Sequence, residues 1–141
     1  MHSDDTGDNI FKISDPETWW CRITHVSDGH KLMTIELNRL NELNQFNYNE
    51  KIHITFRKVM YFSGPMSWIG ANFRLAQNDE LVKFQAMTHE FNFSYEDHLL
   101  FICSMFSHPI QLLANAGGST DINGNDLVMV PDPRFRRASP A

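Results

Sequence analysis

Cysteine is scarce in this chain of 141 residues, and the two that are present, Cys21 and Cys103, each lie within an apolar stretch. Small secreted domains that depend on disulfides carry many more cysteines. There is no Cys-x-x-Cys pair and no Gly-x-Ser-x-Gly motif. Gly117-Gly118 is not followed by the Lys-Ser/Thr of a phosphate-binding loop. We therefore expect two buried free thiols and no recognisable catalytic motif.

Long hydrophobic runs and excess positive charge are also lacking. No apolar run approaches the ~20 residues of a membrane span, and the acidic start MHSDDTGDN differs from a secretory signal. The net charge of −5 gives no overall attraction to nucleic acid or anionic lipid. Arg134, Arg136 and Arg137 make the last residues locally basic, as is common in solvated termini. These features predict a cytoplasmic protein that binds neither membranes nor nucleic acid.

Helix-forming residues are not concentrated anywhere, whereas there are 11 phenylalanines, which favours β structure. Apolar residues make up 42% and charged residues 21%, as in ordinary globular proteins. We expect a mainly β single domain over residues 1–141, in which antiparallel hairpins form a sandwich or partly closed barrel with at most one or two short helices. Residues 1–14 are expected to be a flexible arm whose end is attached by Ile10, Phe11 and Ile13, and residues 131–141 a mobile tail.

A first hairpin is predicted by the alternation of apolar and polar side chains in residues 19–26 and 31–38. The three-residue loop Ser27-Asp28-Gly29, with Gly29 in the left-handed conformation, keeps the apolar residues on one face. Trp20 and Arg22 then point the other way, opposite Glu36 and Thr34. The expected apolar pairs are Ile23 with Met33, Cys21 with Ile35 and Trp19 with Leu37.

Residues 51–76 have the most regular pattern and predict a second hairpin around Ser63-Gly64-Pro65-Met66. An even loop keeps both apolar sets on one face. It leaves Lys58 on that face, so a bulge near Arg57-Lys58, which turns Val59 and Tyr61 inward, is the alternative. The expected pairs are Phe62 with Ser67, Met60 with Ile69, Phe56 with Phe73 and Ile54 with Leu75 on one face, and Tyr61 with Trp68 and Arg57 with Asn72 on the other.

The remaining segments have weaker patterns. Residues 39–50 are predicted to be an irregular connection, because their asparagines compete for backbone hydrogen bonds. Residues 99–106 are predicted as a strand, with a helix as the alternative for such a short apolar run. The other predictions are a turn at 77–80, short strands at 81–87 and 91–95, a strand or short helix at 110–116, a loop at 118–126 and a last strand at 127–130.

The first candidate site is an aromatic face shared by the two hairpins. Tyr61 pairs with Trp68 near the Gly-Pro turn, beside Arg57 and Arg74, and Trp20 lies on the corresponding face of the first hairpin. Aromatic residues and arginine are enriched in the hot spots of protein interfaces. This face is a binding surface if it is open, and part of the core if both faces of the sheet are covered.

The second candidate site contains histidines and acids near the ends of the strand predicted at 91–95. His89, Glu90, Asp97 and His98 have the side chains to bind a divalent ion or to perform acid–base chemistry. No tight metal-binding spacing such as His-x-x-x-His is present. An ordinary pair of charged loops is therefore the favoured interpretation, and no cofactor is predicted.

The order of the pieces from Trp19 to Ala76 is a strand, an Asp-Gly turn, a strand containing TIEL, a polar spacer and ITFRKVMYF. It resembles a loose group of small bacterial β domains, some of which are immunity proteins of polymorphic toxin systems. The resemblance lies in hydrophobic spacing, covers less than half of the chain and carries over no functional residue. The resemblance implies an immunity-like role, and the function we expect is that of a non-enzymatic protein-binding module that acts by surface occlusion on a protein partner, or of a homo-oligomer. The alternative is a small metal-dependent enzyme or a metal- or ligand-binding β domain.

Overall fold

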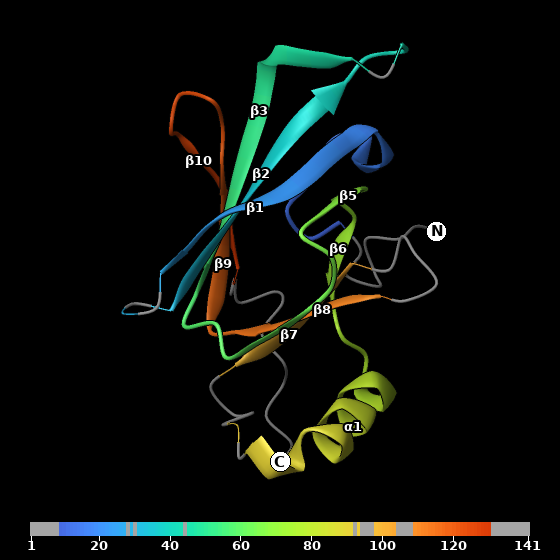
Figure 1. The fold of residues 1–141 in the computed structure, drawn as a ribbon, viewed down its shortest axis with the longest axis vertical. Coiled ribbons are helices and arrows are strands. Elements are labelled where there is room, and N and C mark those ends of the chain that lie inside the picture. Colours follow the sequence, from blue (N-terminus) through green and yellow to red (C-terminus); the bar gives the residue numbers. More distant parts are fainter. Residues whose placement is uncertain are drawn as a thin grey trace.

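Ten strands in the described part of the chain form two antiparallel sheets (Figure 1). The computed structural model describes residues 9–27, 29, 31–43, 45–91, 93, 98–103 and 109–130. Sheet A has the strand order β10-β9-β3-β2-β1-β5, and sheet B has the order β4-β8-β7-β6. The strands are β1 Trp19–Ser27, β2 Leu32–Leu40, β3 Phe46–Arg57, β4 Tyr61–Ser63, β5 Ser67–Ile69, β6 Phe73–Leu75, β7 Leu99–Cys103, β8 Ile110–Ala114, β9 Ala116–Thr120 and β10 Asp126–Val130.

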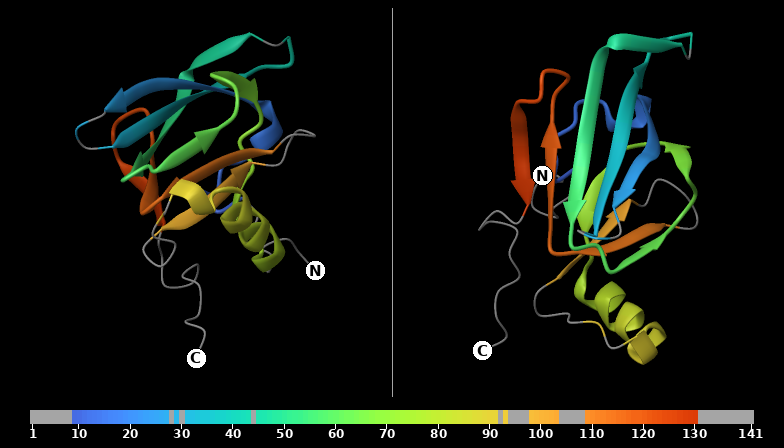
Figure 2. Two further views of the ribbon diagram at one scale, coloured as in Figure 1. Left: turned by 60° about the horizontal axis from the view of Figure 1, so that its bottom comes forward. Right: turned by 60° about the vertical axis from the view of Figure 1, so that its left-hand side comes forward.

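The two sheets enclose the main core, and one helix, α1 (Asn78–Met87), adds a third layer (Figure 2). The helix packs on the face of sheet B that points away from sheet A. This arrangement confirms the expected mainly β sandwich, and it covers sheet B on both faces. None of the described helices is long and apolar enough to cross a membrane. The second core, between α1 and sheet B, contains Leu81, Phe84, Leu100, Ile102 and Leu113.

Strands β1 and β2 form the first hairpin as predicted, but their pairing is shifted by two residues. Ile23 pairs with Ile35 and Cys21 with Leu37. Because the shift is even, the same side chains stay on the core face. Gly29 is not left-handed as expected; Lys31 is, with φ of 53°, and its carbonyl accepts a hydrogen bond of 2.8 Å from the backbone of Val59. This contact with another segment fixes a loop that local sequence alone does not determine.

The second predicted hairpin, over residues 51–76, is wrong. Its first half belongs to β3, which pairs with β2 and β9. The chain then enters sheet B as β4 beside β8, returns to sheet A as β5 beside β1, and enters sheet B again as β6 beside β7. The segment that looked like one hairpin therefore passes between the two sheets three times.

Two residues with positive φ lie where the chain changes sheets. They are Lys58, with φ of 53°, and Gly70, with φ of 123°. After Lys58, the backbone of Met60 donates a hydrogen bond of 2.8 Å to Leu113 in sheet B. The irregularity that the alternative prediction located at Arg57-Lys58 is thus a corner that ends β3, not a bulge within a hairpin.

Residues 39–50, predicted to be an irregular connection, mostly extend β2 and β3. The side-chain oxygen of Asn41 accepts hydrogen bonds from the backbone of Leu43 (2.8 Å) and Gln45 (3.0 Å). The backbone of Asn41 donates to the carbonyl of Gln45 (2.8 Å). One asparagine therefore closes a short turn between two long strands, and the asparagine-rich composition does not require a long loop.

The residues predicted as a turn and a short strand, 77–80 and 81–87, instead lead into and form α1. The side chain of Glu80 accepts a hydrogen bond of 2.8 Å from the backbone of Gln77, as in a capping box. Arg74 of β6 donates two hydrogen bonds of 2.7 Å to the same carboxylate. Leu81 and Phe84, three residues apart, form the buried side. Capping and packing onto sheet B thus stabilise a helix that buries only two of its apolar residues.

The chain after α1 follows the predictions only in part. His89–Phe91 is a 3-10 turn, not the start of a strand, and residues 92 and 94–97 lie outside the described residues. Strand β7 confirms the prediction of a strand, and not a helix, in the segment predicted at 99–106. For residues 110–116 a strand and a short helix were both open, and the structure has a strand, β8. Strand β10 confirms the strand predicted at 127–130. Residues 104–108 lie outside the described residues. The first residues of the loop expected at 118–126 instead belong to strand β9. Its two glycines are uncommon in strands, so the sequence does not indicate one there.

Residues 9–13 lie between the sheets and not in a flexible arm, which corrects the prediction for residues 1–14. Ile10, Phe11 and Ile13 are each at most 2% exposed, and the backbone of Ile10 donates a hydrogen bond of 2.9 Å to Phe73. These three residues attach the segment as expected, because burying large apolar side chains outweighs the cost of ordering it. Residues 1–8 and the predicted tail, 131–141, lie outside the described residues.

Phe11 is at the centre of a cluster of aromatic rings that joins both sheets. Its ring centroid lies 5.9 Å from that of Phe56 in sheet A, and 5.8 and 6.1 Å from those of Phe73 and Phe101 in sheet B. Phe56 and Phe73, predicted as neighbours in a hairpin, meet across the core with centroids 6.1 Å apart. The N-terminal segment therefore completes the core.

Both cysteines are buried free thiols, as predicted. The sulfur atoms of Cys21 in β1 and Cys103 in β7 lie 3.4 and 3.6 Å from the carbonyl oxygen of Gly70. The indole nitrogen of Trp68 donates to the same oxygen at 2.7 Å. Burial, with a smaller contribution from Cys103, raises the pKa of Cys21 well above its ordinary value. Both thiols therefore act as packing groups at the corner where the chain passes from β5 to β6.

Gly117 in β9 is expected to tolerate substitution poorly. A Cβ atom there would lie 2.9 Å from the ring of Phe56 and 3.1 Å from that of Phe11. Since both rings are buried, Gly117→Ala is expected to lower the free energy of unfolding by about 1–3 kcal/mol, measured by urea denaturation. Gly29→Ala is the control, because its Cβ would meet nothing within 4 Å. Equal stabilities of the two variants would contradict the tight packing of β9 beneath these rings.

Candidate functional site

The outer face of sheet A carries the polar side chains of β1, β2 and β3. The intervening residues of these strands point into the main core, and directly paired residues of antiparallel strands share a face. Sheet B lies against the inner face of sheet A, so both sheets separate α1 from this outer face. The register gives one row of Trp20, Asn38 and Lys51 and a second row of Arg22, Glu36 and His53. We call these six residues and Ile69, which pairs with Trp20, the Glu36 face.

Glu36 is at the centre of this face and is only 7% exposed. Two guanidinium nitrogens of Arg22 lie 2.8 Å from its Oε1. The ammonium of Lys51 lies 3.0 Å from Oε2, and Nε2 of His53 lies 3.7 Å from the same atom. Each oxygen of the carboxylate therefore faces a cation, and Arg22 and Lys51 are held in defined positions on an otherwise open sheet.

The environment of Glu36 fixes its charge. Burial by itself raises the pKa of the carboxyl, but hydrogen bonds from Lys51, Arg22 and Asn38 outweigh burial and lower the pKa to about 2. A general base that works at neutral pH needs a pKa near the working pH. Glu36 is therefore suited to holding two cations in place and not to transferring protons.

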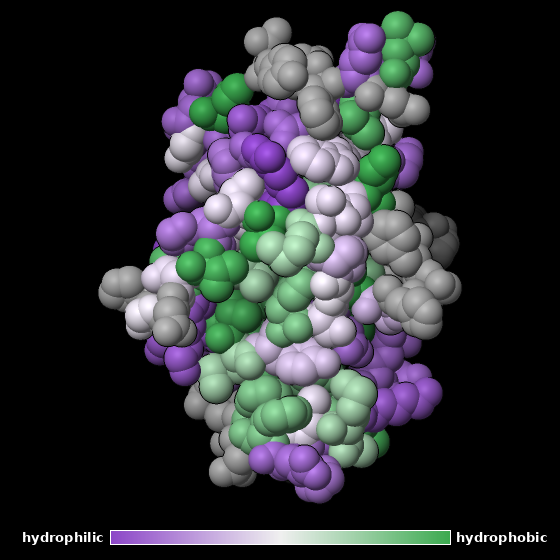
Figure 3. Space-filling model, in the orientation of Figure 1, coloured by the Kyte–Doolittle hydropathy of each residue, from purple (hydrophilic) through white to green (hydrophobic). Residues whose placement is uncertain are grey.

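Apolar side chains border the charged cluster on its β5 side. The guanidinium of Arg22 lies 5.4 Å from the ring centre of Trp20, which is a cation–π distance. Ile69, opposite Trp20 on the edge strand, is 49% exposed, and Met66 just before β5 is 67% exposed. In Figure 3, strongly hydrophilic side chains gather over β1 and β2, and hydrophobic ones lie lower, towards α1. The face thus combines a partly exposed tryptophan, fixed cations and exposed aliphatic side chains.

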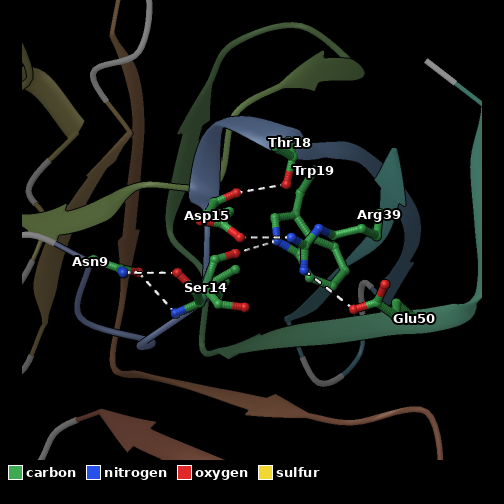
Figure 4. Close-up of polar contacts among 8 residues, drawn as sticks. Asn9, Ser14, Asp15, Thr18, Trp19, Arg39 and Glu50 are labelled. Atoms are coloured by element: carbon green, nitrogen blue, oxygen red, sulfur yellow. Dashed lines mark hydrogen bonds and ion pairs between the residues drawn. The ribbon is translucent and has the colours of Figure 1, made fainter. Parts of the chain in front are cut away.

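A second polar network lies at the far end of the same strands and has a structural role (Figure 4). Arg39 lies 2.7 Å from Asp15 and 3.2 Å from Glu50, and 5.4 Å from the ring centre of Trp19. The indole nitrogen of Trp19 donates to the carbonyl of Ser14 at 2.8 Å. These contacts tie the N-terminal segment to β1, β2 and β3, so we assign this network to stability.

The five residues predicted to form an aromatic face do not lie together. Trp20 is on the Glu36 face, whereas Trp68 points inward and is 5% exposed. Tyr61 lies in sheet B and packs against Phe84 of α1, with ring centroids 5.1 Å apart. Arg57 ends β3, and Arg74 is bound to Glu80. The prediction fails for Tyr61 and Trp68, because the hairpin that would have put them side by side does not exist.

The residues proposed to bind a metal are also not grouped among those the structure describes. His89 is exposed, and its Nδ1 lies 3.0 Å from the carbonyl of Ala86. Glu90 is exposed in the same 3-10 turn, His98 is half-buried just before β7, and Asp97 lies outside the described residues. Within the described ranges, no three His, Cys, Asp or Glu side chains form a group that could hold a metal ion.

Sequence reasoning missed Glu36 and Lys51 as members of a site. With the predicted register, Glu36 faced Trp20, and Arg22 faced Thr34. The observed shift of two residues puts Arg22 opposite Glu36, and opposite charges on directly paired residues stabilise a sheet. The opposite charges of Arg22 and Glu36 were therefore the signal in the sequence that could have identified Glu36 as a site residue. Pairing these two charges would also have given the correct register of β1 and β2.

No protein-family model, curated protein or solved structure matches this chain. Its function has to be inferred from its own side chains.

Proposed function

We propose that the protein is a non-enzymatic protein-binding module that contacts its partner through the Glu36 face. The observation that carries the proposal is the coverage of the two sheets. Sheet B is covered on both faces, whereas the outer face of sheet A presents Trp20 and Ile69 beside Arg22 and Lys51. Tryptophan and arginine are enriched in the energetically dominant parts of interfaces.

The ion pairs on this face favour binding over simple solvation. Long cationic side chains lose rotamer freedom when a partner immobilises them, at a cost of about 0.5–1.5 kcal/mol each. Glu36 already holds Arg22 and Lys51 in the free protein, so part of this cost is met before the partner arrives. A face that is ordered in advance suits a module that occludes a surface of its partner. Surface occlusion is the mode of action expected from the sequence.

The replacement Ile69→Lys is expected to weaken partner binding by at least about tenfold, because it puts a charge at the apolar border of the face. The measurement is affinity capture from native lysate, followed by titration of the captured protein against each variant. Val82→Lys on α1 is the matched control, since Val82 is 63% exposed and lies on the opposite side of the molecule. If the partner binds Ile69→Lys as tightly as wild type but binds Val82→Lys much more weakly, the binding surface lies on α1 and the proposal is wrong.

A further inference from the structure

The charges that the Glu36 face exposes to solvent are positive. Glu36 is the one acid among the residues that define this face, and its side chain is only 9% exposed. The side chains of Arg22 and Lys51 are 50% and 30% exposed, and both are cationic at neutral pH. One carboxylate balances one of these two cations, so the part of the face that meets solvent has an excess of positive charge.

The neighbouring outward side chains of sheet A do not offset this excess. The next row towards the β1–β2 loop contains one histidine and two threonines, namely His25, Thr34 and Thr55. Arg57 follows on the same side of β3 and adds a further cation. Asp126 lies on β10, which is two strands, or about 10 Å, from β3. Glu50 already contacts Arg39, at 3.2 Å.

The guanidinium of Arg22 is oriented so that it can bind a second carboxylate. Its Nε and Nη2 atoms both lie 2.8 Å from Oε1 of Glu36, which places Glu36 along one side of the group. A guanidinium has five N–H donors on three nitrogens, so Nη1 and the outer hydrogen of Nη2 form a second edge. Two parallel N–H groups of this kind match the two oxygens of a carboxylate.

Apolar side chains beside the cations favour a protein segment over a polyanion as the ligand. Ile69 is 49% and Met66 67% exposed, and Trp20 contacts the guanidinium of Arg22, so an apolar side chain of the partner would be covered there. The net charge of −5 repels a long polyanion such as nucleic acid. A short acidic segment interacts mainly with the local charges, because screening limits electrostatic interactions to about 8 Å at physiological salt.

We infer that the partner of the Glu36 face is a protein with an acidic segment. A carboxylate of this segment binds the guanidinium of Arg22, and an adjacent apolar side chain packs on Trp20 and Ile69. Lys51 adds attraction on the other side of Glu36. This inference rests on the proposed function, which makes the Glu36 face the binding surface, and it adds the chemistry of the ligand.

Ser67 provides a test that leaves the ion pairs around Glu36 in place. It is exposed on β5 directly opposite Arg22, so a substitution there does not disturb the core. In Ser67→Glu the new carboxylate lies beside Arg22 and competes with that of the partner, whereas Ser67→Lys is the matched control with the opposite charge. The probe is a short synthetic peptide of aspartate and leucine, titrated into each full-length variant and followed by the backbone amide signals of nuclear magnetic resonance.

The peptide is expected to shift amides of β1, β3 and β5 in wild type and in Ser67→Lys. Its dissociation constant is expected to be at least about tenfold higher for Ser67→Glu than for Ser67→Lys. Binding is also expected to weaken between about 0.1 M and about 1 M salt, where the Debye length falls from ~10 Å to ~3 Å. Equal binding by the two variants, or no shift in these strands, would overturn the inference.

Two further probes test the class of ligand. A peptide with lysine in place of aspartate is expected not to bind, and a single-stranded oligonucleotide is expected to bind more weakly than the acidic peptide. Tighter binding of either probe at this face would overturn the inference. The captured partner then separates the two proposals. If it is sensitive to Ile69→Lys but binds Ser67→Glu and Ser67→Lys alike, the Glu36 face is the binding surface and its ligand is not acidic. If it is insensitive to all three changes, the proposed function fails as well.

Discussion

Replacing Phe11 by alanine is expected to lower the free energy of unfolding by about 3–5 kcal/mol. The ring lies between Phe56 of sheet A and Phe73 and Phe101 of sheet B, and Phe11 is 1% exposed. Its neighbours are anchored in different strands and different sheets, so they cannot close the cavity without moving the sheets together. Typical domains are stable by only about 5–15 kcal/mol, so this one change removes a large part of the total.

Urea denaturation followed by fluorescence and circular dichroism measures this effect. Phe91→Ala is the matched control, because Phe91 is 61% exposed and its loss is expected to cost less than about 1 kcal/mol. Phe11→Leu is expected to have an intermediate stability, since it fills part of the cavity. If Phe11→Ala is no less stable than Phe91→Ala, residues 9–13 do not form part of the core in solution.

The second large effect is expected at Glu36. In Glu36→Gln the neutral amide cannot balance Arg22 and Lys51, which lie 2.8 and 3.0 Å from the carboxylate. A pKa of about 2 in the folded protein, against an ordinary value of 4.5, corresponds to up to about 3 kcal/mol of stability at pH 7. Glu36→Gln is expected to lose most of this amount. Lys51 and Arg22 remain partly hydrated, which limits the penalty of leaving them unpaired.

The same pair of proteins gives a test by pH. Since folding lowers the pKa of Glu36, its contribution is fully present above pH 4.5 and is lost as the pH falls from 4.5 to about 2. Wild type is therefore expected to lose stability over this range more steeply than Glu36→Gln. Glu80, whose pKa is lowered by Arg74, titrates in both proteins and cancels in the difference. Parallel stability curves between pH 5 and pH 2 would show that the ion pairs around Glu36 contribute nothing.

Side-chain alternation predicted which residues are buried better than it predicted which strands are neighbours. Ile54, Phe56 and Phe73 are core residues as expected, whereas Met60 and Ile69, predicted on the same face, are exposed. Phe56 and Phe73 also belong to different sheets. Alternation depends only on which face of a strand meets the core, and it is the same for a hairpin and for strands in two facing sheets. The corners at Lys58 and Gly70 decide between the two arrangements, and contacts with distant residues such as Leu113 stabilise the first of them.

The candidate site was predicted only at Trp20. Tyr61 and Trp68 were chosen because a hairpin register placed them together, so the error in topology became an error in the site. Glu36 was visible in the sequence as an acid among apolar residues, but its partners Lys51 and His53 come from a strand that was not expected to pair with β2. The helix α1 was missed for a related reason: Glu80 is fixed by Arg74, a contact that periodicity does not show.

The location of residues 9–13 between the sheets has a consequence for how the chain folds. Phe11 precedes its partner Phe101 by 90 residues, and the pairing of β3 is completed only by β9, which also comes much later in the chain. Contacts between such distant residues are entropically costly to form early and slow the folding of β proteins. The apolar segment around Phe11 is therefore synthesised well before its partners, and it stays exposed until the strand that contains Phe101 is available.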